Sequence, residues 1–303
     1  MSDFDVLSGI VVRAQSGFFD VETERGLVVA QVRGRHQRRR LQSDLIAIGD
    51  KVVVHMLEDG TAAIDQIAER ERALSRRAPG REHEQIIVAN PDQSVFVFSC
   101  AEPAPNLRML DRLLVVTEEQ AIPAMICANK IDLVKTREAK QMFGVYDRVG
   151  YPVFYTSAKT GKGVSRLRRV LRGQLSVFAG PSGAGKTSLL NAIEPGLGLR
   201  IGDVSDATGK GTHTTVVPKL VRLENGGYVA DTPGLKAFAL WDIEGEELDG
   251  YFPEIRPLVA ACAFANCAHL DEPDCAVIAA VERGDIDPGR YESYVRMRLG
   301  DAD

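Results

Sequence analysis

The sequence predicts three regions: an N-terminal all-β barrel, a central α/β domain with a mostly parallel sheet, and a C-terminal α-helical domain. Short β-rich runs broken by turn residues fill the first part of the chain and are typical of a small barrel. Apolar strands then alternate with helical patterns, which favours a parallel sheet covered on both faces. Helical segments around a cysteine and histidine cluster follow. We place the regions at residues 1–69, 85–241 and 242–303, with a linker at 70–84.

The composition describes an ordinary globular protein, with 303 residues, 45% hydrophobic and 26% charged. No apolar run approaches the roughly 18 residues of a membrane span, and the first residues lack the features of an export signal. The five cysteines are odd in number and three of them cluster, which favours a metal site in a reducing compartment over a disulfide framework. We therefore expect a cytoplasmic protein with no membrane partner.

Five short runs predict the barrel strands, and an OB-fold is the commonest barrel of this size. The runs are Val6 to Arg13, Gly17 to Glu22, Leu27 to Val32, Lys51 to Leu57 and Ala62 to Ile67. Between the third and fourth lie Arg33, Arg35, Arg38, Arg39 and Arg40. A charge run is often only a solvated loop, but on such a barrel it also provides an electrostatic footprint for RNA phosphates. More arginines crowd the expected linker between Arg70 and Arg81.

The central region is expected to alternate strands and helices. Strands are predicted over residues 93–100, 123–128, 153–155, 175–179, 216–223 and 228–230, and helices over 107–119, 164–171 and 186–193. Cys100 and Cys127 end two apolar strands and are most simply small core residues. In the C-terminal region, Asp287-Pro-Gly is a helix start signal, so a last helix should run to Arg298.

A phosphate-binding loop lies between the strand at 175–179 and the helix at 186–193. Gly180-Pro-Ser-Gly-Ala-Gly-Lys-Thr187 fits G-x-x-x-x-G-K-[ST], whose glycines let successive N–H groups wrap a phosphate chain. The helix adds its positive N-terminal end, Lys186 can reach the terminal phosphates as a catalytic residue, and Thr187 can bind Mg²⁺. The expected nucleotide contacts here are Gly180, Pro181, Ser182, Gly183, Ala184, Gly185, Lys186, Thr187 and Ser188.

Two further motifs favour guanine over adenine. Asn129-Lys-Ile-Asp132 follows a strand, and the Asp132 carboxylate can accept two hydrogen bonds from guanine, whereas adenine would leave this anion unpaired. Asn129 and Lys130 are expected at the base and ribose. Thr156-Ser-Ala-Lys159 ends the next strand, and a backbone N–H of Ser157, Ala158 or Lys159 can reach the guanine oxygen.

The remaining phosphate motif is Asp231-Thr-Pro-Gly234, which ends the strand at 228–230. Asp231 can hold Mg²⁺ through water, and the Gly234 N–H can sense the terminal phosphate. Before it lies Thr208-Gly-Lys-Gly-Thr-His-Thr-Thr215, whose Thr214 and Thr215 are candidates to complete the magnesium shell. Because the apolar Leu235 follows Gly234, His213 is the best local candidate to orient the attacking water. The alternative is a solvent-exposed loop histidine.

The order of the motifs is unusual, because the base-reading motifs precede the phosphate-binding motifs. Such a sheet still assembles if the old termini are joined and the chain is opened elsewhere, since domain termini tend to lie close together. The sequence therefore predicts a circularly permuted GTPase. Its last phosphate motif leads directly into the C-terminal domain, so nucleotide state could move that domain.

The C-terminal cluster, Cys262, Cys267, His269 and Cys275, has the spacing C-x₄-C-x-H-x₅-C. Three thiolates and one imidazole form a closed tetrahedral set, which indicates one structural zinc ion and a zinc-binding domain. Unrelated surface cysteines are the alternative, but exposed free thiols at this density would be a liability.

Together, the barrel, the motif order and the Cys/His cluster resemble the RsgA (YjeQ) family of bacterial ribosome-biogenesis GTPases over essentially the whole chain. The resemblance implies hydrolysis of the GTP β–γ bond with Mg²⁺, stimulated by the small ribosomal subunit, together with rRNA binding and a checkpoint role in late subunit maturation. We expect the chain to act as a monomer. It departs from the family at Gly209-Lys-Gly-Thr-His213, where Gly-Arg-Gly-Arg-His is usual.

Two other functions stay open at this point. One is a nucleotide-gated RNA-binding module in which hydrolysis is incidental, and the other is a P-loop ATPase or small-molecule kinase. Multiple turnover stimulated by ribosomal subunits would exclude the first. Competition between GTP and ATP for the nucleotide-free protein would decide the second.

Overall fold

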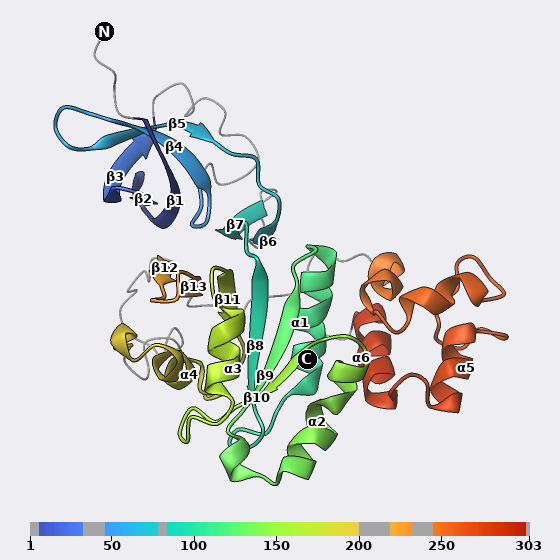
Figure 1. Cartoon of the computed structure of the whole chain (residues 1–303). Coiled ribbons are helices and arrows are strands. Elements are labelled where there is room, and N and C mark those ends of the chain that lie inside the picture. Colours follow the sequence, from blue (N-terminus) through green and yellow to red (C-terminus); the bar gives the residue numbers. More distant parts are fainter. Residues whose placement is uncertain (1–5, 33–45, 78–83, 200–218, 232–244, 301–303) are drawn as a thin grey trace, which may run out of the picture.

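The computed structural model describes residues 6–32, 46–77, 84–199, 219–231 and 245–300 (Figure 1). Several sequence predictions lie outside these ranges: the arginines from Arg33 to Arg40, Arg81, the run from Thr208 to Thr215 with His213, Thr214 and Thr215, and Gly234 with Leu235. Within the described part of the chain, no helix is both long and apolar enough to cross a membrane.

The N-terminal domain is a closed barrel, as predicted. Its strands are β1 (Val6–Gln15), β2 (Phe18–Thr23), β3 (Gly26–Val32), β4 (Lys51–Met56) and β5 (Ala62–Ile67). They pair in the order β1-β2-β3-β5-β4, and a β1–β4 pairing closes the ring. Alternate side chains, including Leu7, Val11, Val21, Val54 and Ile64, fill the interior. This alternation is what a strand with one face on a core requires.

The segment expected to be a linker contains a strand. β6 (Ala73–Arg77) pairs antiparallel with β7 (Glu84–Ala89) and forms a hairpin between the barrel and the central domain (Figure 1). The polar, arginine-rich composition hides this strand, which is anchored by the buried Leu74. Arg70 is also engaged internally, because its guanidinium donates to both carboxylate oxygens of the buried Asp50 at 2.7 Å.

The central domain has a sheet with the order β10-β9-β8-β11-β13-β12, parallel except for β12. Its strands are β8 (Gln93–Ser99), β9 (Ala124–Asn129), β10 (Val153–Tyr155), β11 (Leu175–Ala179), β12 (Lys219–Arg222) and β13 (Tyr228–Asp231). Cys127 within β9 and Cys100 directly after β8 are buried, as expected for core residues.

Helices cover both faces of this sheet (Figure 1). They are α1 (Leu107–Glu119), α2 (Thr136–Arg148), α3 (Val164–Val170) and α4 (Lys186–Ile193), with short 3₁₀ turns η2 (Ile131–Leu133) and η3 (Pro195–Leu197). Phe96 and Phe98 of β8 pack with α1 and α2, whereas Val95 and Val97 pack with α3 and α4. Because successive strand residues point to opposite faces, one apolar strand supplies both cores.

The C-terminal domain consists of short helical elements. They are η5 (Gly245–Tyr251), η6 (Arg256–Ala261), α5 (Ala276–Arg283) and α6 (Pro288–Arg298). The helix start predicted at Asp287 is confirmed, because its carboxylate accepts the N–H groups of Gly289 and Arg290. The domain's own core includes Phe252, Ile255 and Tyr294, and it reaches Val115 of α1.

A buried charge network fixes the C-terminal domain to α1 and α2. Arg290 of α6 donates to Asp111 of α1 at 2.7 Å and to both oxygens of Glu254 at 2.7 and 3.2 Å. Asp111 also accepts hydrogen bonds from Tyr146 at 2.8 Å and Ser293 at 2.5 Å. Burial alone would lower the pKa of Arg290, but the two carboxylates raise it well above its usual range. Arg290 is therefore a permanently charged connector between the two domains.

The barrel meets the central domain through a different kind of contact. Val12 and Ile48 of the barrel pack against Leu175, Val177 and other buried apolar residues of the hairpin and central sheet. At the rim, β1 pairs with β12 at a single described position, and Glu22 forms an ion pair with Arg222. The interior of this joint is therefore mainly apolar. Ion pairs lie at its edge, between Glu22 and Arg222, and where the barrel leads into the hairpin, between Asp50 and Arg70.

Candidate nucleotide site and metal centre

The predicted nucleotide motifs begin side by side at the carboxyl end of the parallel sheet. Asn129 is in register with Ser99, and Tyr155 is in register with Ala128, so the two base-reading motifs leave adjacent strands. The phosphate loop leaves β11, which pairs with β8 on the other side. Open α/β sheets bind their ligands at this end. The topology therefore assembles the motifs that the permuted sequence separates.

The phosphate loop has the backbone that its glycines permit. Gly180, Gly183 and Gly185 have φ values of 142°, 77° and 90°. A Cβ on Gly180 would lie 2.1 Å from the Val97 carbonyl oxygen, and one on Gly185 would lie 2.6 Å from Asn129 Nδ2. The loop backbone lies so close to its neighbours that neither position has room for a side chain. The loop leads directly into α4, whose positive N-terminal end attracts anions.

Lys186 lies over this loop. Its Nζ donates to the carbonyl oxygens of Gly180 at 2.7 Å and Pro181 at 2.9 Å. Thr187 is buried at the start of α4, Ser182 is exposed, and Ser188 is half-buried. The ammonium group is thus held on the loop that would enclose a phosphate chain, where it can exchange carbonyl acceptors for phosphate oxygens.

Asn129 connects three motifs. Its Nδ2 donates to the Ala184 carbonyl at 3.0 Å, and its Oδ1 accepts from Thr156 Oγ1 at 3.2 Å and from the Ala158 N–H at 3.3 Å. The side chain is 1% exposed. Sequence reasoning predicted a base contact here but missed this connecting role, since it depends on three loops meeting in space.

Asp132 has the features of a guanine-reading carboxylate. The Ser157 hydroxyl donates to its Oδ1 at 2.5 Å and holds the pKa of Asp132 below its usual range. The side chain is exposed and therefore open to a ligand. Lys130, with a left-handed φ of 61°, donates from Nζ to the Glu102 carbonyl. Lys159, two residues after Ser157, is exposed. An ionised, oriented carboxylate is the acceptor that guanine requires.

The magnesium and water-orienting assignments stay predictions. Ala230 of β13 is in register with Val177 of β11, so the backbone of Asp231 follows beside the strand that enters the phosphate loop. The structure does not describe the Asp231 side chain. Thr214, Thr215, Gly234 and His213 lie outside the described residues.

The predicted zinc ligands come together in the C-terminal domain. The ligand atoms of Cys262, Cys267, His269 and Cys275 all lie within 4.8 Å of one another. His269 Nδ1 is 3.5 Å from Cys262 Sγ and 3.4 Å from Cys275 Sγ, and these two sulfurs are 3.9 Å apart. Zinc bond lengths of about 2.0–2.3 Å require tetrahedral ligands to lie about 3.6–3.8 Å apart. The donor set and these three separations therefore fit a site that could hold a metal ion.

Burial supports the same conclusion. Cys267, His269 and Cys275 are buried, and Cys262 is half-buried. Burial, with the neighbouring Cys275 and Cys262 thiols, raises the pKa of Cys267 to about 12. Thiolates in such a place need a bound cation to be stable, which is what a metal supplies.

The loop that carries the Cys/His cluster is held in place by side chains that the sequence did not point to. Glu272 accepts the N–H groups of Ala268 at 2.6 Å and Leu270 at 2.9 Å. From α6, the Tyr291 hydroxyl donates to the His269 carbonyl at 2.7 Å, and Tyr294 donates to the Ala268 carbonyl at 2.9 Å. Only the packing of α6 on this loop reveals the two tyrosines.

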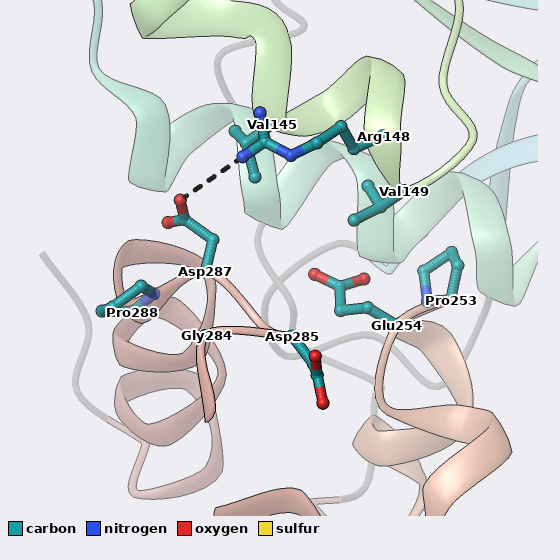
Figure 2. A pocket seen from close by; sticks show the side chains of 9 residues that line it. All are labelled: Val145, Arg148, Val149, Pro253, Glu254, Gly284, Asp285, Asp287 and Pro288. Carbon is teal, nitrogen blue, oxygen red and sulfur yellow. Dashed lines mark ion pairs between the residues drawn. The ribbon is translucent and has the colours of Figure 1, made fainter. Parts of the chain in front are cut away.

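A groove of about 500 Å³ lies between α2 and the C-terminal domain (Figure 2). Arg148 of α2 faces Asp287 across it, with an N to O distance of 4.0 Å. The other lining residues are Val145, Val149, Pro253, Glu254, Gly284, Asp285 and Pro288. None of the predicted nucleotide or metal residues lines it, so this groove is separate from both sites.

The fold and the motif arrangement define a class: a circularly permuted P-loop GTP-binding domain with an N-terminal OB-like barrel and a C-terminal Cys/His domain. A model of the RsgA GTPase family matches residues 67–241, and a model of the RsgA N-terminal domain matches residues 8–64. The chain belongs to the RsgA GTPase family and is a GTP-hydrolysing enzyme. The family resemblance and the predicted permuted fold are thereby confirmed.

Relatives and solved structures agree over nearly the whole chain. The small ribosomal subunit biogenesis GTPase RsgA of Gemmatimonas aurantiaca is 46% identical, over 96% of both chains. Its counterpart in Moorella thermoacetica is 44% identical, over 95% of both. The crystal structure of YjeQ from Thermotoga maritima matches with a TM-score of 0.82 and 36% identity, over 98% of both chains. YloQ, described as a circularly permuted GTPase, matches with a TM-score of 0.77 and 32% identity, over 98% of this chain and 95% of that one.

Proposed function

We propose that this enzyme hydrolyses GTP on the small ribosomal subunit and that its nucleotide state acts as a checkpoint late in the maturation of that subunit. The observation that carries the proposal is the ionised Asp132 carboxylate, which Ser157 orients at the same end of the sheet as the phosphate loop. Relatives named as small ribosomal subunit biogenesis GTPases, aligned over almost their full length, support the choice of partner.

In the proposed GTP complex, Asp132 accepts the N1–H and amino group of guanine, and a backbone N–H of Ser157, Ala158 or Lys159 donates to the guanine oxygen. The loop from Gly180 to Ser188 wraps the phosphates, with Lys186 near the β and γ groups. Bound Mg²⁺ would neutralise developing phosphate charge. Thr187, Thr214, Thr215 and Asp231 are the proposed residues around it, and Gly234 senses the γ-phosphate. His213 orients the attacking water.

The metal centre is proposed to hold one structural zinc ion through Cys262, Cys267, His269 and Cys275. Four protein ligands leave no open position, so this site folds the domain and takes no part in hydrolysis. The barrel, with its arginines from Arg33 to Arg40, and the zinc domain are proposed to contact rRNA on either side of the nucleotide site. The enzyme is proposed to act as a monomer in the cytoplasm.

The decisive experiment measures multiple-turnover GTP hydrolysis with and without purified small subunits. We expect the subunit to increase kcat strongly for the wild-type enzyme. Asp132→Asn should lose GTP affinity and gain affinity for the xanthine nucleotide, because the amide donates where xanthine has a second oxygen. A rate that the subunit leaves unchanged would overturn the proposed partner. Equal GTP affinity in Asp132→Asn would overturn the base-reading assignment, and preference for ATP would indicate an ATPase or kinase.

The RNA contact has its own test. Replacing Arg38, Arg39 and Arg40 with alanine should weaken subunit binding and make its dependence on log salt shallower, by about 0.7–0.9 for each phosphate that these side chains no longer neutralise. The unstimulated hydrolysis rate should stay the same, since these residues are outside the nucleotide motifs. An unchanged salt slope would assign the arginines to a solvated loop.

A further inference from the structure

We propose that Asp249 is a positioning residue of the metal centre: its carboxylate holds the His269 ring so that Nδ1, and not Nε2, is the metal ligand. This inference rests on the zinc site proposed above. Asp249 belongs to η5, outside the stretch that holds the four ligands, and no spacing in the sequence connects it with them.

The His269 ring has two different neighbours. Nδ1 faces the sulfurs of Cys262 and Cys275 at 3.5 and 3.4 Å, and Nε2 faces Asp249 Oδ2 at 3.3 Å. The ring is completely buried. Because a carboxylate only accepts hydrogen bonds, Nε2 must carry the proton, which leaves the Nδ1 lone pair for a metal. Ligand histidines commonly donate their second N–H to a carboxylate, which fixes the tautomer and makes the ligand more basic.

Both partners are themselves held in place. The His269 carbonyl accepts from the Tyr291 hydroxyl, so the residue is fixed at its backbone as well as at Nε2. Asp249 follows the buried Leu248 and precedes the buried Phe252, whose ring stands edge-on to Tyr294 at a centroid distance of 5.5 Å. The short turn η5 is therefore anchored on both sides of the carboxylate, and the pair has little freedom to separate.

Through this contact, metal binding affects a part of the domain outside the ligand loop. The four ligands lie between residues 262 and 275, whereas η5 is the first described element after Asp231. Through Nε2 and Asp249, metal binding at Nδ1 also orders η5. The metal centre thus ties the start of the C-terminal domain to its ligand loop, and loss of Asp249 should weaken both metal affinity and η5.

The test measures the zinc dissociation constant of the full-length protein by competition with a chromophoric chelator. We expect Asp249→Ala to bind zinc about 10- to 100-fold more weakly. Asp249→Asn should lose less, because its amide oxygen still accepts from Nε2–H. Glu247→Gln is the matched control: it removes the same charge from the same turn, but the partner of Glu247 is the Tyr251 hydroxyl. Its zinc affinity should equal that of the wild type.

A second readout observes the ring directly. In protein labelled with ¹⁵N-histidine, long-range proton–nitrogen spectra distinguish a metal-bound nitrogen from one that carries hydrogen, and His269→Gln identifies the signals. We expect Nδ1 bound and Nε2 protonated in the wild type. Zinc affinity of both Asp249 variants within twofold of the wild type, or a metal bound at Nε2, would overturn the role of Asp249 and leave the zinc site intact. A wild-type protein that takes up no zinc would overturn both. If Asp249→Ala fails to fold, Asp249→Asn carries the test.

Discussion

The central domain is joined to its two neighbours by physically different contacts. The barrel packs mainly through apolar side chains, such as Val12 and Ile48 against Leu175 and Val177, with the Glu22–Arg222 pair at the rim. The C-terminal domain is fixed by Arg290, which lies between Asp111 and Glu254 and is 2% exposed. The core of the barrel joint is mainly hydrocarbon, whereas the C-terminal joint contains a buried ion network between the two domains.

The two joints should differ in how well they tolerate a displacement of the neighbouring domain. Apolar contacts are non-directional, so their free energy changes gradually as side chains shift or shrink. A buried ion pair is stable only when its geometry is complete, because either partner left alone is an uncompensated charge. Rotating the C-terminal domain as a body would break the Arg290 network, whereas moving the barrel would mainly slide apolar surfaces. The prediction that nucleotide state moves the C-terminal domain must therefore account for this network.

The largest expected effect is at the ionic joint. Arg290→Met keeps the approximate length of the side chain but leaves Asp111 and Glu254 unpaired, which should cost about 3–5 kcal/mol of local stability. Hydrogen exchange of peptides from α1 and α6 would measure the loss. Arg108→Ala is the control, because its pair with Glu292 at 2.9 Å is exposed and should contribute at most about 1 kcal/mol. Equal exchange in the two variants would show that the buried pair contributes no more than the exposed pair at the same joint, and would contradict the view that Arg290 fixes it.

A smaller, graded effect is expected at the apolar joint. Ile48→Val removes one methylene from a side chain that is 2% exposed, and should cost about 0.5–1.5 kcal/mol. Exchange of β1 and β6 peptides would report it, and salt should not change the difference. Leu27→Ala, on the exposed barrel surface, should have little effect. A loss at Ile48 as large as that at Arg290 would contradict the view that this joint adapts.

The smallest effect is expected at the rim of the barrel joint. The side chain of Arg222 is 63% exposed, so its pair with Glu22 should contribute about 0.2–1 kcal/mol and weaken with salt. A double-mutant cycle of Glu22→Gln and Arg222→Gln, followed by exchange of β2 and β12 peptides at low and high salt, would isolate it. A coupling well above this range, unchanged by salt, would show that the barrel is also fixed by charge.

Some missed elements had a signal in the sequence and others had none. α2 was not predicted, although its buried residues Ala139, Phe143 and Tyr146 follow the i, i+4, i+7 spacing of a helix face. β6 had a much weaker signal in the sequence, because its arginine-rich run contains a single large apolar residue, Leu74. A strand of that kind is stable only when its partner and the domain beneath it are present.

Features carried by a short stretch of chain were determined by the sequence alone. The phosphate loop, the guanine-reading motif and the four metal ligands could be read from spacing, because glycine angles, strand ends and ligand counts are local properties. The permuted order followed from the sequence positions of the same motifs. Their contributions to binding and catalysis remain predictions.

Tertiary structure alone decided which distant side chains meet. Arg290 and Asp111 are 179 residues apart, and neither position has a pattern that requires the other. Asn129 became a connector of three loops, and Asp249 came to face Nε2 of His269, in the same way. The physical reason is that a buried polar group must find partners where the fold places it, and those partners depend on topology rather than on neighbouring sequence.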